Sequence, residues 1–417
     1  MKTLRSKALL ALALSTCPLA ALAQQVPPNA NVVGAWSTLG SWPLIGIHAV
    51  LTPGGNVLTY GTDAAGKQTG KFIYDVWNPN QGGIAAGHTT LPNNTGTDIF
   101  CSSQVLLPQG DIFVAGGDNF VNNATTNTGN SDSNIFAPAT NSLTRAASMN
   151  RARWYSSVTT LPNGESYIQG GTGGTDRAEV RGTNGTFRLL PFDTGAIDWF
   201  YPRNFVAPDG RVFGFDTVGR MYYVSANLGA LTRVGDLNVT GTGSSAAMYA
   251  PGKILQIGGN SNGAITIDIN SGSPQVAATA SLASRRDLVT ATVLANGKVL
   301  ATGGSGQWNQ LVDVNNSAAI WDPASGQWTI GPDGAVARLY HSTALLMPDA
   351  SVLVAGGGAP GPYTNTNAEI YYPPYLFNSS AGFVARPTIT SAPASVTPGS
   401  SFTISVGATD SIARVSI

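Results

Sequence analysis

Residues 102–117 read SSQVLLPQGDIFVAGG, two short apolar segments joined by a Pro-Gln-Gly turn and closed by a glycine pair. Apolar and polar residues alternate in each segment, as in strands that bury one face. Proline followed by glycine favours a tight turn, and the glycine pair permits close backbone packing where the second segment ends. The stretch therefore predicts a β-hairpin within a larger sheet.

The same pattern occurs seven times along the chain. The copies span residues 48–61, 102–117, 156–171, 204–215, 246–259, 291–304 and 342–358. Their turn residues, here called the anchors, are Pro53, Pro108, Pro162, Pro208, Pro251, Ala295 and Pro348, so successive copies lie 43 to 55 residues apart. This spacing is close to the ~40 to 50 residues of a propeller blade. The repeats predict an all-β fold, a seven-bladed kelch-type β-propeller.

Aromatic segments that end in proline follow several of the hairpins and predict outer strands. They are residues 75–79, 135–138, 320–323 and 369–373. Their aromatic side chains would pack between blades, with proline at the strand end. The last repeat runs into Pro373-Pro374 before a fourth strand can form, so we expect residues 34–37 to supply it, because closing the ring removes its free sheet edges.

Residues 387–417 break the repeat pattern. A turn at residues 396–399 and an alternating strand at 402–406 predict the beginning of an immunoglobulin-like (E-set) β-sandwich. Two strands cannot bury a core of their own, so we interpret the chain as a truncated or partial copy of a longer protein. The expected organisation is a signal peptide at 1–23, the propeller at 24–386 and an incomplete C-terminal domain at 387–417.

Composition and the N-terminus indicate an exported protein that does not bind nucleic acid. The 417 residues include 22 basic and 22 acidic side chains, and 11% are charged, about half of the ~25% usual in soluble domains. The first 23 residues have a basic start, a short apolar run and Ala-Leu-Ala before Gln24, as in a cleaved secretory signal. We expect a secreted or periplasmic protein without a membrane span, and a monomer. Lipidation at Cys17 is the weaker alternative.

Residues at equal offset from the anchors should lie at one height around the propeller axis, because blades are structurally equivalent. Seven residues before the anchors, at what we call the ring position, stand Gly46, Cys101, Tyr155, Tyr201, Ser244, Leu288 and His341. Without the signal peptide Cys101 is the only cysteine, either a buried apolar residue or a reactive one. A thiol, two phenols and an imidazole on one ring predict a transition-metal site.

The other candidates do not share the ring position. Tyr340 precedes His341, and on a regular strand the two would point to opposite faces, so we expect an irregular start of the strand there. His48 and His88 are interpreted as structural or surface residues. Tyr201, which does stand at the ring position, could be a core residue, a substrate contact or a coincidence of the offset.

The sequence around these positions resembles the galactose oxidase and glyoxal oxidase family of copper radical oxidases, and is most similar to its glyoxal-oxidase-like branch. The matching stretches are residues 98–101 (DIFC), 153–157 (RWYSS), 337–342 (ARLYHS) and 368–377 (AEIYYPPYLF). The resemblance extends from about Trp42 to the C-terminus.

The resemblance implies a copper site and roles for four residues. Tyr155 and Tyr340 would be metal ligands together with His341. Cys101 would be joined to Tyr155 by a thioether, forming a protein-derived radical cofactor, and Tyr340 would take the substrate proton. The implied reaction is the oxidation of an aldehyde or primary alcohol by dioxygen, with hydrogen peroxide as product.

Two departures from the family pattern bear on activity. The family has a second histidine ligand in its C-terminal sandwich, whereas residues 412–417 contain none, so we expect activity to be impaired in this chain. Galactose oxidase has a tryptophan over the cross-linked tyrosine where residues 170–173 here read Gly-Gly-Thr-Gly. Without this aromatic lid, small aldehydes or exposed groups of a polymer are better substrates than galactose. Tyr201 and Arg203 are candidate substrate-binding residues by blade position.

Two other functions were weighed. A non-catalytic propeller could bind glycans or partner proteins at the cell surface, but it would have no need of Cys101 level with Tyr155 and His341. A hydrolase has little support, because the sequence has no Gly-x-Ser-x-Gly motif with a partnered histidine.

Overall fold

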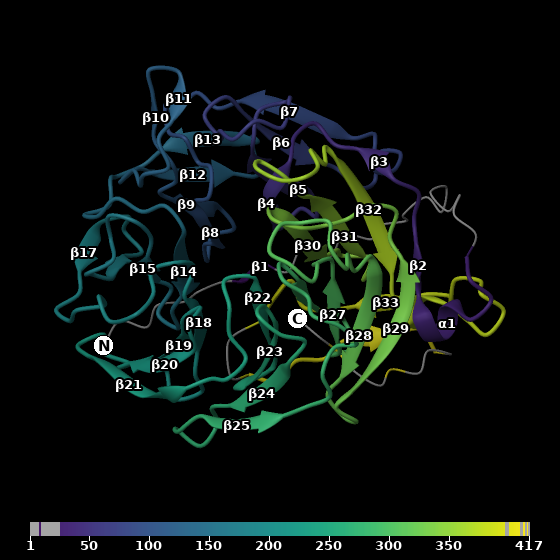
Figure 1. The fold of residues 1–417 in the computed structure, drawn as a ribbon. Coiled ribbons are helices and arrows are strands. Elements are labelled where there is room, and N and C mark those ends of the chain that lie inside the picture. The colour runs from purple at the N-terminus through teal and green to yellow at the C-terminus, as the bar shows by residue number, and fades with distance from the viewer. Residues whose placement is uncertain (1–7, 10–25, 397–399, 409–411, 413–414, 416–417) are drawn as a thin grey trace.

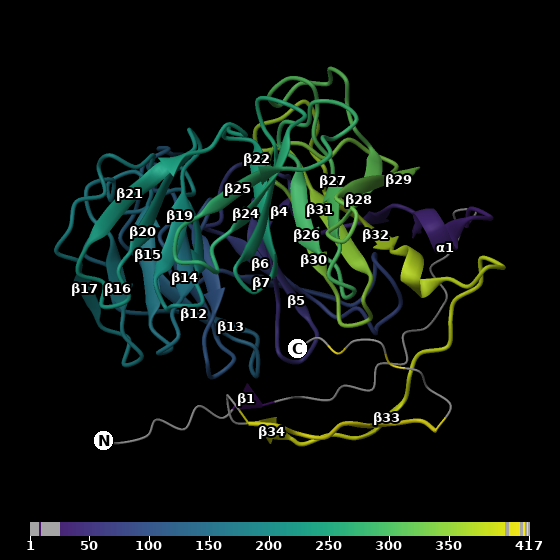
Figure 2. The same ribbon diagram turned by 90° about the horizontal axis from the view of Figure 1, so that it is seen from below.

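A computed structural model describes residues 8–9, 26–396, 400–408, 412 and 415 of the chain. The expected signal peptide therefore lies outside the described residues, apart from Ala8 and Leu9. Seven sheets stand around a central axis as a β-propeller, which confirms the predicted propeller architecture (Figures 1 and 2).

Each blade is an antiparallel sheet whose first strand lies innermost. The first three blades are β4 (Gly46–Leu51), β5 (Val57–Gly61), β6 (Ile73–Trp77) and β7 (His88–Pro92); β8 (Ser103–Leu106), β9 (Ile112–Ala115), β12 (Ser133–Ala137) and β13 (Ser142–Arg145); and β14 (Ser156–Thr160), β15 (Ser166–Gly170), β16 (Glu179–Arg181) and β17 (Phe187–Leu189). Blades 4 and 5 are β18 (Arg203–Val206), β19 (Val212–Phe215), β20 (Arg220–Val224) and β21 (Leu231–Asp236); and β22 (Ser244–Ala250), β23 (Lys253–Gly258), β24 (Ala264–Asp268) and β25 (Gln275–Ala278). Blades 6 and 7 are β26 (Thr290–Val293), β27 (Val299–Thr302), β28 (Ser317–Asp322) and β29 (Gln327–Asp333); and β30 (Ser342–Leu346), β31 (Val352–Gly356), β32 (Asn367–Tyr372) and β2 (Ala35–Trp36).

The turns between first and second strands follow the predicted chemistry. In blade 2 the Gly110 N–H donates to the Leu107 carbonyl at 2.9 Å, and Gly110 has φ 95°, which glycine adopts without steric cost. Blade 7 has Ala350 at this place, with φ 61° and a similar bond to the Met347 carbonyl. The hairpin is therefore kept even where alanine must adopt a left-handed conformation.

The aromatic segments predicted as outer strands are in fact third strands. They belong to β6, β12, β28 and β32, and a fourth strand lies outside each of them. For the last blade this agrees with the expectation that residues 34–37 add a fourth strand. In the other three blades the sequence did not mark the fourth strands β7, β13 and β29, because they are largely exposed and lack regular apolar alternation.

The N-terminal segment closes the ring as predicted. Ala35 and Trp36 of β2 pair with Tyr372 and Tyr371 of β32, and β3 (Gly40–Ser41) pairs further along the same strand. The short helix α1 (Ala30–Val33) precedes β2, and the indole N–H of Trp36 donates to the Pro332 carbonyl in blade 6 at 2.9 Å. Segments more than 300 residues apart thus complete blade 7.

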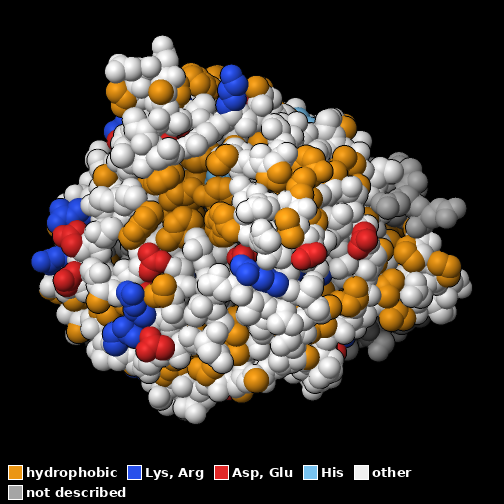
Figure 3. Space-filling model, viewed as in Figure 1, with side chains coloured by type: hydrophobic (Ala, Val, Ile, Leu, Met, Phe, Trp, Pro, Cys, Tyr) orange, Lys and Arg blue, Asp and Glu red, His pale blue; other side chains and the backbone are white. Residues whose placement is uncertain are grey.

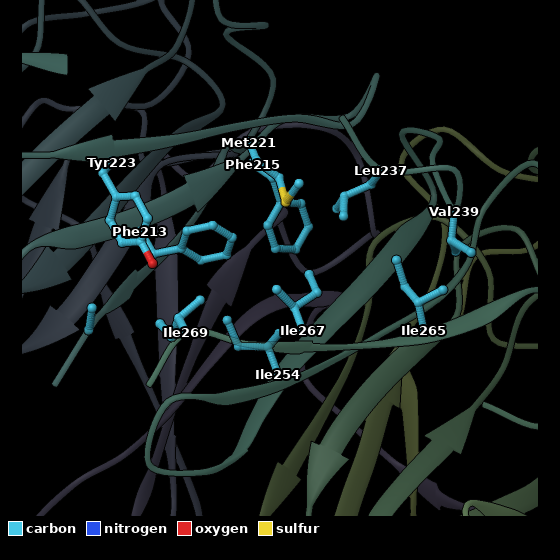
Figure 4. Close-up of a cluster of buried hydrophobic side chains, with 11 residues drawn as sticks. Phe213, Phe215, Met221, Tyr223, Leu237, Val239, Ile254, Ile265, Ile267 and Ile269 are labelled. Carbon is cyan, nitrogen blue, oxygen red and sulfur yellow. The ribbon is translucent and has the colours of Figure 1, made fainter. Parts of the chain in front are cut away.

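Apolar side chains interlock between neighbouring blades. Between blades 4 and 5, Phe213, Phe215 and Met221 face Ile254 and Ile267, all nearly or fully buried (Figure 4). Because each blade packs on both neighbours, the core is a series of interfaces around the axis, and the inner strands hold their starting residues at a common level.

The remaining elements are short. They are β10 (Phe120–Val121), β11 (Ala124–Thr125), the 3-10 helix η1 (Pro374–Leu376), β33 (Ile389–Ser391), β34 (Ser395–Val396), β35 (Ser405–Val406) and β1 (Ala8–Leu9). β33 pairs with β35 and β1 with β34, below the propeller in Figure 2. The immunoglobulin-like sandwich and the domain boundaries stay predictions. None of the helices among the described residues is long and apolar enough to cross a membrane.

Candidate metal centre

Backbone hydrogen bonds link the ring positions of three successive blades. The Tyr155 N–H donates to the Cys101 carbonyl at 3.0 Å, and the Tyr201 N–H donates to the Tyr155 carbonyl at 2.9 Å. All three residues have positive φ, at 52°, 68° and 41°. The chain bends just before each inner strand, and the bend turns the side chain toward the propeller axis.

The predicted irregular start of the blade 7 inner strand is present. His341 has φ 64° and lies just before β30. The bend brings the rings of Tyr340 and His341 together, with centroids 3.7 Å apart and planes at 25°. Both side chains therefore face the same site, although they are adjacent in the sequence.

Buried arginines hold these bends on their own blades. Arg153, two residues before Tyr155, pairs with Glu179 of β16 at 2.9 Å and donates to the Gly170 carbonyl at 2.6 Å. Arg338 likewise pairs with Glu369 of β32 at 3.3 Å. Since both pairs are almost fully buried and bonded to backbone as well, they fix the segments that carry the phenols.

The side chains of Cys101, Tyr155, Tyr340 and His341 meet, and together they are called the cluster below. The hydroxyls of Tyr155 and Tyr340 are hydrogen-bonded to each other, and Cys101 Sγ lies 3.4 Å from His341 Nε2. His341 Nδ1 is 2.7 Å from the Gly358 carbonyl, which only accepts, so Nδ1 donates and Nε2 carries the lone pair. The imidazole is thereby oriented as in metal-binding histidines, whose second nitrogen is held by a carbonyl or carboxylate.

The cluster is uncharged near neutral pH. Burial raises the pKa of Cys101 and Tyr340, and burial together with the neighbouring Cys101 and Tyr340 raises the pKa of Tyr155. Burial lowers the pKa of His341 to about 4. A bound cation would instead lower the pKa of the two phenols, because positive charge stabilises phenolate. Among the described residues no three histidine, cysteine and carboxylate side chains form a metal-binding group, so a metal here would need phenolic oxygen.

Aromatic rings surround Tyr155, and sequence reasoning missed the most important of them. Phe200 lies over its ring with centroids 4.5 Å apart and planes at 26°, and Trp154 lies 4.2 Å away at 52°. The glycine-rich segment at 170–173 carries no aromatic ring, as the sequence shows, but Phe200, in the loop before β18, lies over the Tyr155 ring instead. Phe200 directly precedes Tyr201 at the ring position, and this adjacency was the sequence signal that could have identified it. Figure 3, viewed as in Figure 1, shows hydrophobic side chains around the centre of the face that it draws.

The two candidate substrate-binding residues lie beside the cluster. The ring of Tyr201 stands edge-on to Tyr155, with centroids 5.0 Å apart at 88°. The Arg203 guanidinium donates to the Ser244 carbonyl at 2.7 Å, and burial lowers its pKa to about 10. Both line a cavity of about 320 Å³ formed by the first residues of β14, β18 and β22.

The two other histidines differ from one another. His88 is bonded to Asp75 Oδ2 at 2.7 Å and to the Ile84 carbonyl at 2.8 Å, a structural role as expected. His48 is buried and stacks on Tyr60, so a surface role for it is excluded. Burial, and then the proximity of His341, lowers its pKa to about 3. The ring position does not select His48, because His48 lies two residues beyond it. Of the remaining ring positions, Leu288 is not among the hydrophobic side chains packed around Cys101 and Tyr155, and the Ser244 hydroxyl donates to the Gly241 carbonyl at 2.6 Å.

The fold and these side chains define a seven-bladed propeller with a central cluster of phenol, thiol and imidazole groups. No family model matches the chain. It is 28% identical to a galactose oxidase of Gibberella zeae, over 92% of this chain and 61% of that protein. It is 26% identical to the aldehyde oxidase GLOX of Vitis pseudoreticulata, over 74% of this chain and 66% of that protein.

A solved structure agrees with the fold. A fungal alcohol oxidase of the AA5 family, determined in complex with copper, superposes with a TM-score of 0.75 at 24% identity, covering 86% of this chain and 81% of that one. The family resemblance is thus confirmed by similarity to proteins named galactose oxidase and aldehyde oxidase GLOX. The chain spans about 60% of the length of the galactose oxidases that it matches.

Proposed function

We propose that the protein is a secreted copper radical oxidase that oxidises aldehydes or primary alcohols with dioxygen and releases hydrogen peroxide. The observation that carries this proposal is the direct contact of two phenols, a thiol and an oriented imidazole on the propeller axis. Similarity to galactose oxidases and aldehyde oxidases supports it.

The side chains fit a copper ion. Phenolic oxygen and imidazole nitrogen are ligands that Cu(II) accepts, and His341 offers Nε2 already fixed by the bond from Nδ1 to Gly358. The phenols of Tyr155 and Tyr340 share one hydrogen bond in a buried place where each could exchange its proton for a metal bond. Tyr155, Tyr340 and His341 would hold the ion. When bound, copper would supply a one-electron redox couple and a position for the substrate oxygen.

The residues around that ion would divide the remaining chemistry. Cys101 would bond to the Tyr155 ring with loss of one hydrogen from the thiol and one from the ring, both taken up by dioxygen as hydrogen peroxide. The sulfur donates electron density to the phenol, so Tyr155 loses an electron more easily and serves as the second one-electron site. Tyr340 would accept the hydroxyl proton of the substrate. Overall, an alcohol and dioxygen give an aldehyde and hydrogen peroxide, whereas an aldehyde first adds water, and its hydrate and dioxygen give a carboxylic acid and hydrogen peroxide.

The surroundings favour a substrate with an apolar or flat face. Trp154, Trp199 and Phe200 are partly exposed around Tyr155, and Trp308 is 38% exposed beside Tyr340. Stacking on such rings suits small aldehydes, aromatic alcohols and the faces of sugars. Tyr201 and Arg203 stay candidate substrate contacts. Secretion, the monomeric state and the expected impairment of activity also stay predictions.

The proposal is tested by peptide mapping after aerobic loading with Cu(II). We expect a linked peptide containing Cys101 and Tyr155 that is lighter than its two parts by a pair of hydrogen atoms. The link should be absent from Cys101→Ser and from Tyr155→Phe. Hydrogen peroxide released from a panel of small aldehydes and primary alcohols is measured in parallel.

Tyr201→Phe is the matched control. Tyr201 contacts the same cluster, and its hydroxyl donates to the Ser102 carbonyl at 3.3 Å, yet the proposal gives it no part in the link. The linked peptide should therefore persist in Tyr201→Phe. Free Cys101 in copper-loaded protein would refute the oxidase and favour the alternative, a propeller that binds glycans or proteins.

A further inference from the structure

Trp308 connects the cluster to solvent. The residue is 38% exposed, and its ring lies beside that of Tyr340, with centroids 5.5 Å apart and planes at 49°. The Tyr340 hydroxyl is hydrogen-bonded to the Tyr155 hydroxyl. Three rings that can each lose an electron thus form a continuous series from the surface to the centre of the cluster.

Parts of three blades fix the position of this indole. Trp308 lies in the loop between β27 and β28 of blade 6. The side-chain amide of the next residue, Asn309, donates to the Pro360 carbonyl in blade 7 at 3.2 Å. A Cβ added to Gly243, just before β22 of blade 5, would lie 3.2 Å from the indole Cζ3, so the ring packs closely over this glycine. The contact with Tyr340 is therefore built into the packing of the loop.

The other tryptophans beside Tyr155 are less suited to exchange electrons with solvent. Trp154 lies nearer, with ring centroids 4.2 Å apart, but its Nε1 is buried and has no hydrogen-bond partner among the described residues. Trp199 lies 6.4 Å away and is only partly exposed. A tryptophan that gives up an electron becomes positively charged, and burial disfavours charge. Of these three tryptophans, Trp308 is the best placed to carry that charge.

We propose that Trp308 is an electron relay, through which Tyr340 and Tyr155 exchange single electrons with small redox partners in solution. Its use by the enzyme rests on the proposed function, in which Tyr155 is a one-electron site. Indole and phenol are among the side chains that lose a single electron most readily. An exposed indole in contact with a phenol therefore lets an external oxidant or reductant act on the cluster without entering it.

The transfer has two steps. The indole of Trp308 first gives one electron to the external oxidant and becomes a radical cation. An electron from the hydrogen-bonded pair of Tyr340 and Tyr155 then restores the indole, and the oxidised phenol releases its hydroxyl proton to water. The net change is one electron to the oxidant, one released proton and one phenoxyl radical. A one-electron reductant reverses it.

The first test uses the copper-free full chain, so that its outcome does not depend on metal binding. A light flash generates tris(bipyridine)ruthenium(III), which removes single electrons from exposed side chains, and transient absorption distinguishes indolyl from phenoxyl radicals. We expect the indolyl signal of the unmodified protein to convert into a phenoxyl signal. This conversion should be lost in Trp308→Phe, and in Tyr340→Phe the indolyl radical should form without converting.

Trp328→Phe is the matched control. Trp328 lies on β29 of the same blade and is partly exposed, but it packs beside Trp321 in the core between blades 5 and 6, and its indole donates to the Ala280 carbonyl at 2.7 Å. The conversion should persist in this variant. Conversion that also persists in Trp308→Phe would overturn the inference.

A second test, on copper-loaded protein, separates the relay from a substrate contact. Stopped-flow absorption follows the oxidation of Tyr155 by hexachloroiridate(IV) in the absence of substrate. The relay predicts that Trp308→Phe slows this reaction on the order of tenfold and that Trp328→Phe leaves it unchanged. If Trp308 only bound substrate, Trp308→Phe would change KM for the aldehyde and leave the rate with hexachloroiridate(IV) unaltered, which would overturn the inference.

The proposed function can fail independently of the relay. If the Cys101–Tyr155 link and peroxide release are found but the conversion persists in Trp308→Phe, the oxidase stands and the relay falls. If the conversion requires Trp308 but no link forms on copper loading, the oxidase is refuted and the electron transfer from the phenols to Trp308 stands.

Discussion

The bend at the ring position is not limited to the residues of the candidate site. Leu288 occupies this position in blade 6 with φ 63°, close to the 64° of His341, although it lies outside the cluster. Left-handed backbone is unfavourable for such residues by roughly 1–2 kcal/mol. The other two ring positions, Gly46 and Ser244, do not have positive φ, so the bend is present in five blades and is not by itself a mark of the site.

Ala350 allows the same kind of strain to be measured at a turn. Five other blades have glycine two residues after the anchor, whereas Ala350 has φ 61°. We expect Ala350→Gly to raise the free energy of unfolding by about 0.5–1 kcal/mol, because relief of the left-handed strain exceeds the added chain entropy of glycine. Urea denaturation measures the change.

The reciprocal substitution is Gly210→Ala in blade 4. Gly210 has φ 83°, and an added Cβ would meet nothing closer than the Ala226 methyl at 3.8 Å. The loss of stability, about 1–2 kcal/mol, would therefore come from backbone strain alone. Equal stability of Ala350→Gly and the unmodified protein would show that the blade 7 turn holds no strain.

At the scale of elements, the loop before β8 positions Cys101. Asp98 Oδ1 accepts from the Gly70 N–H at 2.6 Å and the Phe100 N–H at 3.1 Å, and Oδ2 accepts from the Thr69 hydroxyl at 3.1 Å. The loop is thus held to blade 1 while its strand belongs to blade 2. Together with the arginine pairs before Tyr155 and Tyr340, this contact makes the site depend on loops tied to rigid sheets.

A pH dependence of stability follows from Asp98. Burial raises the pKa of Asp98 above its ordinary value of 3.8, despite three hydrogen bonds that lower it. The folded protein therefore binds this proton more tightly than the unfolded chain does. The stabilisation is complete below 3.8 and is lost as the pH rises through the folded-state pKa.

Asp98→Asn removes this titration and keeps an oxygen for the two backbone donors. We expect the stability of the unmodified protein relative to Asp98→Asn to increase as the pH falls from 7 toward 4. Thermal unfolding of both proteins across this range gives the comparison. A difference that stays constant with pH would contradict the raised pKa.

At the scale of the whole molecule, the ring depends on one short closing strand. Trp36 of β2 is 4% exposed, stacks near Tyr371 with ring centroids 5.0 Å apart, and donates a hydrogen bond into blade 6. We expect Trp36→Ala to lower the free energy of unfolding by about 3–5 kcal/mol, the range for a large buried aromatic side chain. Trp308→Ala, at a residue 38% exposed, should change it by less than ~1 kcal/mol.

Guanidinium denaturation of these two variants tests whether closure stabilises the whole propeller. Each blade packs on both neighbours. Weakening the contact between β2 and β32 in blade 7 therefore exposes the interfaces on both sides of that blade. If Trp36→Ala lowers the free energy of unfolding no more than Trp308→Ala does, the closing strand contributes little to the stability of the propeller.

The sequence by itself determined the repeat and, through it, the level of the site. Turn residues and strand alternation are local signals, so the hairpins could be predicted from neighbouring residues alone. Equal offsets from the anchors then selected Cys101, Tyr155, Tyr201 and His341, which the structure brings together. The bend at His341 also brings the adjacent Tyr340 to this place, where its hydroxyl is hydrogen-bonded to that of Tyr155, and its role stays a prediction.

Only the tertiary structure decided what lies between the blades. Phe200 reaches Tyr155 from the next blade, and His48, after a register shift in β4, stacks on Tyr60. Neither contact follows from a repeat period, because each depends on how side chains from different sheets interlock. The period fixes where each strand begins, whereas packing across the interface decides which side chains near that level meet.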